Sequence, residues 1–447
     1  MSPFSRLPMD IFPFIFDHLS CRDYYVLVRV CRSFHEKVLP YVYKHISFEV
    51  TKSRRSARRL AFLLRTLFEQ PHLANHVTTF KLLGPHPCWS QYNPWPEDIG
   101  TSPIAMWGLE NCNTLSKAQK IFASNQFYQL LDPDVHKSLA QDRGRCKDAL
   151  ASLILTRFTQ LTSLELGDGF LMYSLFLPHI IKKAPSFFPQ LQHIHFGDQR
   201  MDLENSLSYV DLDLIRPILY LPTAKSFAWR MTQPWQFRWK EAAPQNRNLT
   251  SLHLFRTNIS RPLLGEILST TPNLKRLCYE QEILFRSNMT QQQKGQLSLY
   301  TSLDELGHAL QRVQGTLEEL KLSFKLAPGS SPRKDIGDKN SSFPPIQGTL
   351  TALRDMKRLR KIDIPMIMIL GWYPDFAPRL EEVMPSAVKH FTLSDDFVSF
   401  CPWVQGFSCF KKIGLIGEYL LNREIHAQEL RELKLKLTMP RVNLCHD

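Results

Sequence analysis

The chain has 447 residues, of which 43% are hydrophobic and 11% aromatic, and its formal net charge is +13. This composition excludes a chain that is disordered throughout, because disordered proteins contain few aromatic residues and too little apolar surface to fold. The longest apolar stretch, IPMIMILGWY at 364–373, is shorter than the ~18 residues that a membrane-spanning helix needs. We therefore expect folded domains and no membrane partner.

The N-terminal stretch LPMDIFPFIF does not have the pattern of an export signal. It is bracketed by Asp10 and Asp17 and interrupted by Pro13, whereas a secretory signal contains an uninterrupted apolar segment and a small-residue cleavage site. The nine cysteines are scattered, without a Cys-x-x-Cys pair. Together these features predict reduced thiols and a cytoplasmic or nuclear location.

Residues 7–45 have the pattern of three short helices. Asp10 can cap the first helix, which places Pro13 in the opening turn, where the missing N–H has no helical partner to lose. Ser20 and Asp23 have the spacing of a capping box at the start of the second helix, and CRSFHEKV fits the third. About 40 residues bury too little apolar surface to be stable alone, so we expect this bundle to complete its core against a partner.

The same segment resembles an F-box in the order and spacing of a set of residues. They are Leu7, Pro8, Asp10, Ile11, Ile15, Leu19, Asp23, Leu27, Val30, Cys31, Arg32 and Phe34. The resemblance implies docking on the Skp adaptor of an SCF (Skp, cullin, F-box) ubiquitin ligase, with cullin bound through the adaptor. It places the adaptor contacts at Leu7, Pro8, Ile11, Ile15, Leu19, Val30, Cys31 and Phe34. Alternatively, these residues form the core of the module itself, and Tyr24 and Tyr25 depart from the aliphatic residues that are commoner in the family.

The next segment, TKSRRSARRLAFLLRTLF, predicts an amphipathic helix within a basic linker. Its cations are Lys52, Arg54, Arg55, Arg58 and Arg59. They could form a nuclear-import signal or contact an acidic partner, or they could simply be the solvated face of the helix. A nucleic-acid-associated scaffold is a further alternative, but it rests only on this cluster and the net charge, and nucleic acid is not expected as a partner.

A six-residue frame, apolar-x-x-apolar-x-apolar, recurs through the rest of the chain. It begins at residues 77, 161, 191, 249, 274, 317, 359, 388, 410 and 430, with a weaker copy at 224. Helical segments such as LLGEILSTTPN lie between many copies, so the repeated unit is strand, loop, helix, loop. Stacked units of this kind give parallel strands on one side and helices on the other.

This pattern resembles the leucine-rich repeat family, although the Asn that usually follows the strand is missing. We therefore predict an α/β fold with three parts. They are a three-helix F-box at 1–48, a basic linker helix at 49–75, and a curved, irregular leucine-rich-repeat-like solenoid for substrate recognition at 76–447. Residues 327–345 have the composition of a flexible loop. Two Trp-containing stretches, 84–108 and 229–240, either anchor a partner or fill gaps in the solenoid.

The third and fifth residues of each frame point to one face of the predicted sheet. We expect the client protein to bind there. The candidate substrate contacts are His193, His195, Arg230, His253, Phe255, Arg276, Lys321 and Lys412. Because basic groups predominate, the predicted client has acidic or phosphorylated segments. The alternative is that most of these side chains are ordinary solvated positions.

The sequence contains no motif for catalysis or metal binding that we recognise. HEKVL at 35–39 has Leu39 where a second zinc-binding His would stand, and there is no nucleophile elbow or phosphate-binding loop. We therefore expect a non-catalytic chain without cofactor or metal. The F-box resemblance implies a substrate-recognition subunit of a ubiquitin ligase. The alternative is an F-box and repeat protein that acts outside ubiquitin transfer.

Overall fold

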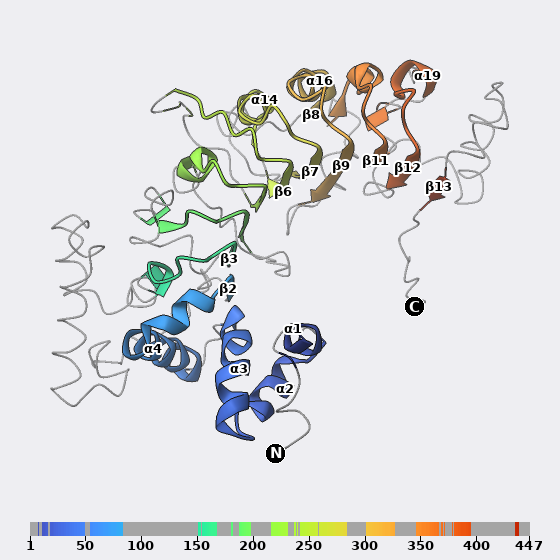
Figure 1. The fold of residues 1–447 in the computed structure, drawn as a ribbon. Helices are drawn as coiled ribbons and strands as arrows, with labels where there is room; N and C mark the ends of the chain where they lie inside the picture. Colours follow the sequence, from blue (N-terminus) through green and yellow to red (C-terminus); the bar gives the residue numbers. More distant parts are fainter. Residues whose placement is uncertain are drawn as a thin grey trace, which may run out of the picture. The chain divides into compact units, whose positions relative to one another are not determined.

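The computed structural model has an α/β architecture built of parallel strands and helices (Figure 1). It describes residues 8, 11–16, 18–49, 54–83, 151–152, 154–167, 180–181, 187–197, 216–230, 237, 239, 242–257, 259–283, 301–326, 346–365, 368–369, 371, 378, 380–394 and 434–437. The chain divides into two compact units. The first consists of Met1–Met201 and Asp213–Thr223, and the second of Asp202–Leu212 and Ala224–Asp447. Among the described helices, none combines the length and the apolar character needed to cross a membrane.

The first unit opens with the three predicted helices, α1 (Ile11–Phe16), α2 (Cys21–Leu27) and α3 (Arg32–Lys44). Pro13 is the third residue of α1, in the opening turn as predicted, whereas Asp10 lies outside the described residues. α3 extends beyond CRSFHEKV and continues past Pro40. Tyr41 and Val42, which follow this proline, pack on the core of the bundle. Their burial favours the longer helix despite the N–H that Pro40 lacks.

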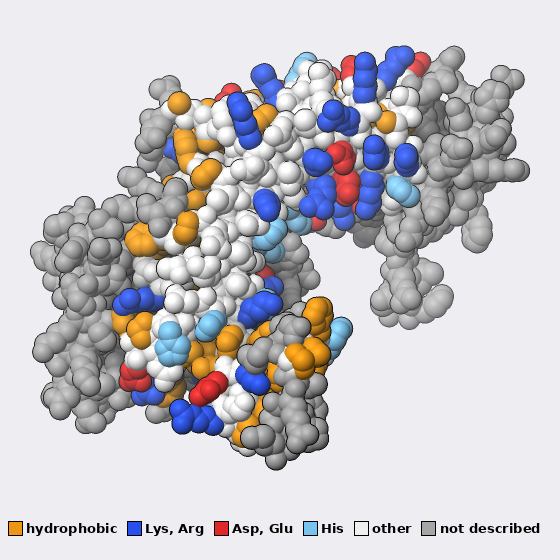
Figure 2. All heavy atoms as spheres, in the orientation of Figure 1, with side chains coloured by type: hydrophobic (Ala, Val, Ile, Leu, Met, Phe, Trp, Pro, Cys, Tyr) orange, Lys and Arg blue, Asp and Glu red, His pale blue; other side chains and the backbone are white. Residues whose placement is uncertain are grey.

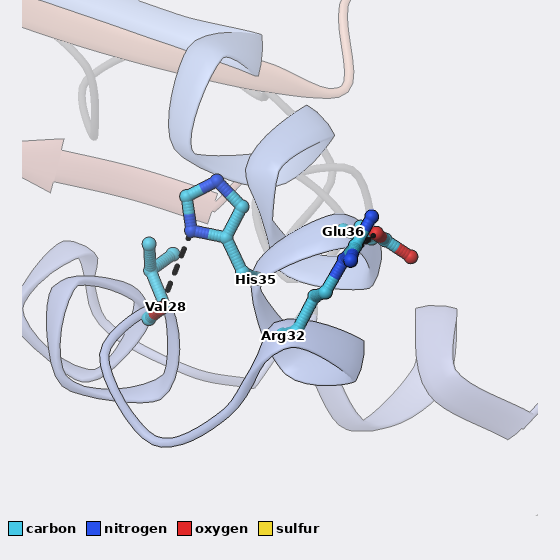
Figure 3. A network of polar contacts seen from close by, with 4 residues as sticks. All are labelled: Val28, Arg32, His35 and Glu36. Carbon is cyan, nitrogen blue, oxygen red and sulfur yellow. Dashed lines mark hydrogen bonds and ion pairs between the residues drawn. The ribbon is translucent and has the colours of Figure 1, made fainter.

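The predicted capping box at the start of α2 is confirmed. The backbone N–H of Asp23 donates to Ser20 Oγ at 3.3 Å, and the Asp23 carboxylate accepts from the Ser20 N–H at 2.9 Å and from the Ser20 hydroxyl at 2.6 Å. These hydrogen bonds lower the pKa of Asp23 below its ordinary value. At the next turn, His35 Nδ1 lies 3.4 Å from the Val28 carbonyl oxygen, and Arg32 pairs with Glu36 at 3.1 Å (Figure 3).

The helical bundle continues directly into a sheet, which the sequence patterns did not indicate. Strand β1 (His45–Glu49) follows α3 without a linker and pairs in parallel with β2 (Thr79–Leu83). Between the two strands lie α4 (Arg54–Glu69) and the short helix η2 (Pro71–His76). α4 falls within the predicted linker and buries Leu60, Leu64 and Leu67, while Arg59 is exposed. The side chains of Arg54, Arg55 and Arg58 lie outside the described part of the chain.

Parallel strands form the rest of the sheet in each unit. In the first unit, β2 pairs with β3 (Ser163–Leu166) and β3 with β4 (His193–Phe196), and η3 (Arg216–Tyr220) belongs to the same unit. In the second unit the strand order is β5 (Ser226–Trp229), β6 (Ser251–Thr257), β7 (Arg276–Ile283), β9 (Glu319–Leu326), β11 (Lys361–Pro365), β12 (His390–Ser394) and β13 (Lys434–Leu437). A separate pair is formed by β8 (Thr301–Ser302) and β10 (Ile346–Gln347).

Helices of the second unit lie in a row along one side of its strands (Figure 1). They are α14 (Arg261–Ser269), α16 (Leu303–Gln311), η4 (Thr351–Asp355) and α19 (Leu380–Val383). Each packs against the next: α14 on α16, α16 on η4, and η4 on α19. The predicted unit of strand, loop, helix and loop is therefore present here.

The frame predicts which side chains are buried. In β6, for example, Leu252 and Leu254 are buried at the fourth and sixth positions, and Leu249 is buried at the first. Third positions pair with third positions on neighbouring strands, as Ser251 does with Arg276. The copy at 430 is an exception, because His390 pairs with Lys434, two residues later than that frame predicts. The copy at 410, the stretch 84–108, most of 229–240 and the loop at 327–345 lie outside the described residues.

A backbone ladder joins successive copies of the frame just before each strand begins. The carbonyl oxygen at the second frame position accepts two N–H donors from the next copy. The Thr250 carbonyl, for instance, accepts from Lys275 at 2.9 Å and Arg276 at 3.0 Å. Thr162 adds a hydroxyl that donates to the Thr78 carbonyl at 3.0 Å. The strands are thus held in register by main-chain groups, whatever the side chain at that position.

Candidate functional site

Large apolar side chains are exposed on the N-terminal bundle. They are Ile11 (39% exposed), Phe14 (73%), Tyr25 (62%), Val26 (58%) and Val30 (60%). The remaining large hydrophobic residue found exposed in the described chain is Phe62 on α4. Hydrophobic side chains gather over α1 in the space-filling view (Figure 2). We call these five residues the apolar patch. Single exposed apolar residues are ordinary, but five in so short a segment make this a candidate binding surface.

The inner side of the same helices explains why the patch faces outward. Phe12, Phe16 and Val38 are buried, and the Phe16 ring meets the Tyr41 ring edge-on with 4.9 Å between centroids. The Tyr24 hydroxyl donates to the Phe16 carbonyl. Since adjacent residues on a helix do not share a face, fixing Phe12, Phe16 and Tyr24 inward leaves Phe14 and Tyr25 on the outer side.

The residues predicted to contact an adaptor fall into two groups. Pro8, Ile11, Val30 and Cys31 are exposed. In contrast, Ile15, Leu19 and Phe34 are partly buried against the core of the bundle. Leu7 lies outside the described residues. The internal-core reading therefore applies to Ile15, Leu19 and Phe34, whereas Pro8, Ile11, Val30 and Cys31 are accessible to a partner.

Sequence reasoning missed Phe14, Tyr25 and Val26 as members of the apolar patch. In the sequence, Tyr25 is distinguished only as a departure from the aliphatic residues of the resembled family. A usable signal was present: the first helix, IFPFIF, has five large apolar residues in six, which is more than one inward-facing stripe can bury.

Comparison with protein families matches residues 4–49 to the F-box-like family. Residues 4–49 are an F-box-like domain. The match spans α1, α2, α3 and β1. Domains of this kind generally bind Skp-type adaptors. No curated protein is significantly similar to the chain.

A second candidate surface lies on the strands that follow the F-box-like domain in the sequence, and it was predicted to bind the client. In the first unit, His193 is exposed on β4, and His195 is half-buried with Nδ1 3.9 Å from a Glu165 carboxylate oxygen. In the second unit, Arg276 and Lys321 are exposed and His253 is half-buried. Lys412 lies outside the described residues.

The predicted exposure of Arg230 and Phe255 is wrong, because both side chains are only 1% exposed. β5 ends at Trp229, so the alternation of the strand does not extend to Arg230. In β6 the register shifts between Leu254 and Thr257, and Arg256 has a positive φ of 46°. Near this irregularity Phe255 is buried with its ring against that of His253.

Charges on these faces are more mixed than the mainly basic candidate substrate contacts predicted. Cross-strand ion pairs join Lys81 to Glu165 at 2.7 Å and Lys321 to Asp363 at 3.6 Å. Basic side chains with interleaved acidic ones gather over β9, β11 and β12 (Figure 2). Exposed pairs of this kind contribute little stability, about 0–1 kcal/mol each, and they neutralise part of the basic surface.

Three side chains of metal-binding type also meet on the second unit's sheet. His253 on β6 lies near Cys278 and Glu280 on β7, with one ligand atom from each within 4.8 Å of the others. Burial, followed by the nearby Glu280 carboxylate, raises the pKa of the Cys278 thiol to about 12. A nucleophilic cysteine requires the opposite shift, so this thiol is not activated for catalysis by its protein surroundings.

Proposed function

We propose that the chain is a substrate-recognition subunit of an SCF-type ubiquitin ligase. Its F-box-like domain docks on the Skp adaptor, cullin binds through that adaptor, and the region after the domain holds a client protein. The observation that carries this proposal is the apolar patch. Three fully buried side chains stabilise the bundle weakly, whereas covering the five exposed ones would remove apolar area from water at about 25 cal/mol per Å².

The client-binding part is, in this proposal, a leucine-rich-repeat-like solenoid. Support comes from the in-register strands of each unit, from the row of helices in the second unit, and from the shared backbone ladder. These features give a scaffold on which side chains at the third and fifth frame positions form one continuous face within each unit.

The proposed client carries acidic or phosphorylated segments. Arg276 and Lys361 are exposed at third frame positions of the second unit, and Arg360 and Lys389 are exposed at second positions. Arg and Lys bind carboxylates and phosphates through charge-assisted hydrogen bonds. Because Lys321 is already paired with Asp363, we place the anion contacts at Arg276, Arg360, Lys361 and Lys389.

The chain itself performs no chemistry in this proposal. It raises the concentration of the client near a ubiquitin-loaded enzyme, so that the rate increase comes from proximity. The location proposed for this activity is the cytoplasm or the nucleus.

The adaptor contact is tested with point variants, because deleting residues 1–48 would also remove most of β1 from the sheet. The full chain carrying Tyr25→Asp and Val30→Asp is compared with the parent and with Phe62→Asp, an exposed apolar control on α4. Co-purified adaptor and cullin are quantified from cells. We expect the double variant to lose both proteins and the control to retain them. Equal recovery of adaptor by all three chains would refute the proposal.

Recovery of adaptor without cullin from the parent chain would instead indicate a role outside ubiquitin transfer.

The client surface is tested separately with Arg276→Gln and Lys361→Gln, which should reduce capture of acidic or phosphorylated proteins without changing adaptor recovery. Lys81→Gln is the matched control, because Lys81 is already engaged with Glu165. Client capture that is insensitive to phosphatase treatment and to salt would argue against the anion contacts.

A further inference from the structure

His253, Cys278 and Glu280 converge on one face of the second unit's sheet. His253 and Cys278 are direct register partners on the adjacent parallel strands β6 and β7. Glu280 follows Cys278 by two residues, so its side chain emerges on the same face. The three ligand atoms lie within 4.8 Å of one another. The sheet therefore brings together a nitrogen, a sulfur and an oxygen donor from two strands.

The donors are partly shielded from water and do not satisfy one another. The side chains of His253 and Glu280 are 29% and 21% exposed. His253 Nε2 lies 3.8 Å from a Glu280 carboxylate oxygen, too far for a hydrogen bond, and it has no hydrogen-bond partner within the described part of the chain. The ring of Phe255 meets the imidazole edge-on with 5.5 Å between centroids and so restricts its orientation.

The neighbouring cation does not fill this position. Lys321 is the register partner of Cys278 on the next strand, β9, but its ammonium group is paired with Asp363 at 3.6 Å. A divalent cation bound here would accept electron pairs from the Glu280 carboxylate and from His253 Nε2, which has no hydrogen-bond partner within the described part of the chain, and from the Cys278 sulfur once its proton is released.

We propose that His253, Cys278 and Glu280 form a binding site for a zinc-type divalent cation, with the fourth coordination position open to solvent. Zinc is bound by imidazole, thiolate and carboxylate at about 2.0–2.3 Å, so ligands in a tetrahedron lie about 3.3–3.8 Å apart. The observed limit of 4.8 Å exceeds this by about 1 Å, a distance that side-chain rotation on neighbouring strands can close. The thiol proton is released to solvent when the Cys278 sulfur binds the metal.

The donor set selects the class of cation. A thiolate together with an imidazole favours zinc and similar transition metals, whereas Mg²⁺ and Ca²⁺ prefer oxygen ligands alone. Three protein ligands and an open position resemble the coordination of zinc sites that exchange a water molecule. The site lies entirely within the second unit, so the inference does not depend on the adaptor contact proposed above.

The test uses the full chain, stripped of metal with a chelator under reducing conditions and titrated with Co²⁺ and then with Zn²⁺. The readouts are the thiolate-to-cobalt charge-transfer absorption and the zinc affinity measured by competition with a chromophoric chelator. We expect Cys278→Ser to lose one equivalent of thiolate-bound cobalt. We expect Glu280→Gln to weaken zinc binding at least about tenfold while keeping part of the absorption band. Cys31→Ser, at an exposed thiol of the F-box-like domain, is the matched control and should behave like the parent.

Two results would overturn the inference. One is a Cys278→Ser chain that binds the same number of zinc and cobalt ions, with the same spectrum, as the parent. The other is a parent chain that binds zinc no more tightly than Glu280→Gln. Circular dichroism establishes whether each variant is folded. If Cys278→Ser is unfolded, His253→Gln takes its place in the comparison. Metal bound by other cysteines does not affect the outcome, because each variant is compared with the parent chain, which contains the same other cysteines.

Discussion

The F-box-like domain and the strand and helix array of the second unit differ in where their apolar side chains lie. In the domain, Phe12, Phe16 and Val38 are buried while the five residues of the apolar patch remain exposed. In the array, the apolar residues of the frames, such as Leu252, Leu277 and Leu320, are 2% exposed or less. The array buries its apolar residues internally and presents charges, whereas the domain presents apolar surface that a partner can cover.

The physical reason for this difference is the number of elements available for packing. A sheet residue in the array has neighbouring strands on both sides and helices beneath, so each added unit buries the apolar face of the previous one. Three short helices have too little interior to enclose all of their large apolar side chains, so five of them remain exposed. Four experiments test this contrast, in order of decreasing expected effect.

The largest effect is expected from matched core truncations in the two regions. Phe16→Ala should destabilise the helical bundle by about 3–5 kcal/mol and Leu320→Ala should destabilise the array by about 2–5 kcal/mol. A saturating adaptor should restore the bundle in Phe16→Ala, by about 2.7 kcal/mol at one hundred times its Kd, but should leave Leu320→Ala unchanged. Hydrogen exchange measured by mass spectrometry over α1–α3 and over β9 follows the two regions separately. Equal rescue of both variants would contradict the contrast.

Removing one member of the apolar patch should affect binding more than stability. Phe14→Ala is expected to change the free energy of unfolding by less than about 0.5 kcal/mol, because this side chain is 73% exposed. It should weaken adaptor binding by more than about 1 kcal/mol if Phe14 is an anchor of the interface. Calorimetric titration of purified adaptor measures the affinity. Phe62→Ala should leave the affinity unchanged. A loss of equal size in that control would show that Phe14 is not a specific anchor of the interface.

The capping box should have an intermediate effect confined to α2. Ser20→Ala is expected to destabilise the domain by about 1 kcal/mol through loss of the N-cap. It should also raise the pKa of Asp23 toward its ordinary value, because hydrogen bonds from Ser20 are the main cause of the lowered pKa. A lowered folded-state pKa means that the stabilising contribution is present above the unfolded pKa of about 3.9 and is lost as the pH falls through the folded value. NMR titration of the Asp23 carboxyl checks this, with Ser33→Ala on α3 as the control that leaves the titration unaltered.

The smallest effect concerns the backbone ladder. Thr162→Val removes the hydroxyl that donates to the Thr78 carbonyl at 3.0 Å, but that oxygen still accepts two backbone N–H groups, from Thr162 and Ser163. The expected cost is therefore about 0.5–1 kcal/mol, read as a shift of the denaturation midpoint relative to Thr392→Val. A much larger loss would mean that the side chain, not the main chain, holds the register.

Much of the local structure could be predicted because its causes are local. The capping box at Ser20 depends on residues three apart. Burial at the fourth and sixth frame positions follows from the alternation of side chains along a strand. The same alternation did not predict that Phe255 is buried, in a part of β6 where the register shifts. The exposed members of the candidate site were only partly predictable, because Ile15 and Ile11 look alike in the sequence while one packs on the core and the other remains accessible.

By itself, the sequence determined the three helices, the recurring parallel strands and the apolar excess of the N-terminal segment, since each is encoded by spacing within a few residues. Only the tertiary structure decided that β1 pairs with β2, that Phe14, Tyr25 and Val26 face outward, and that His253 meets Cys278 and Glu280. The physical reason is that residues distant in sequence meet through strand register and helix packing. Those arrangements depend on the summed burial of many side chains rather than on any one motif.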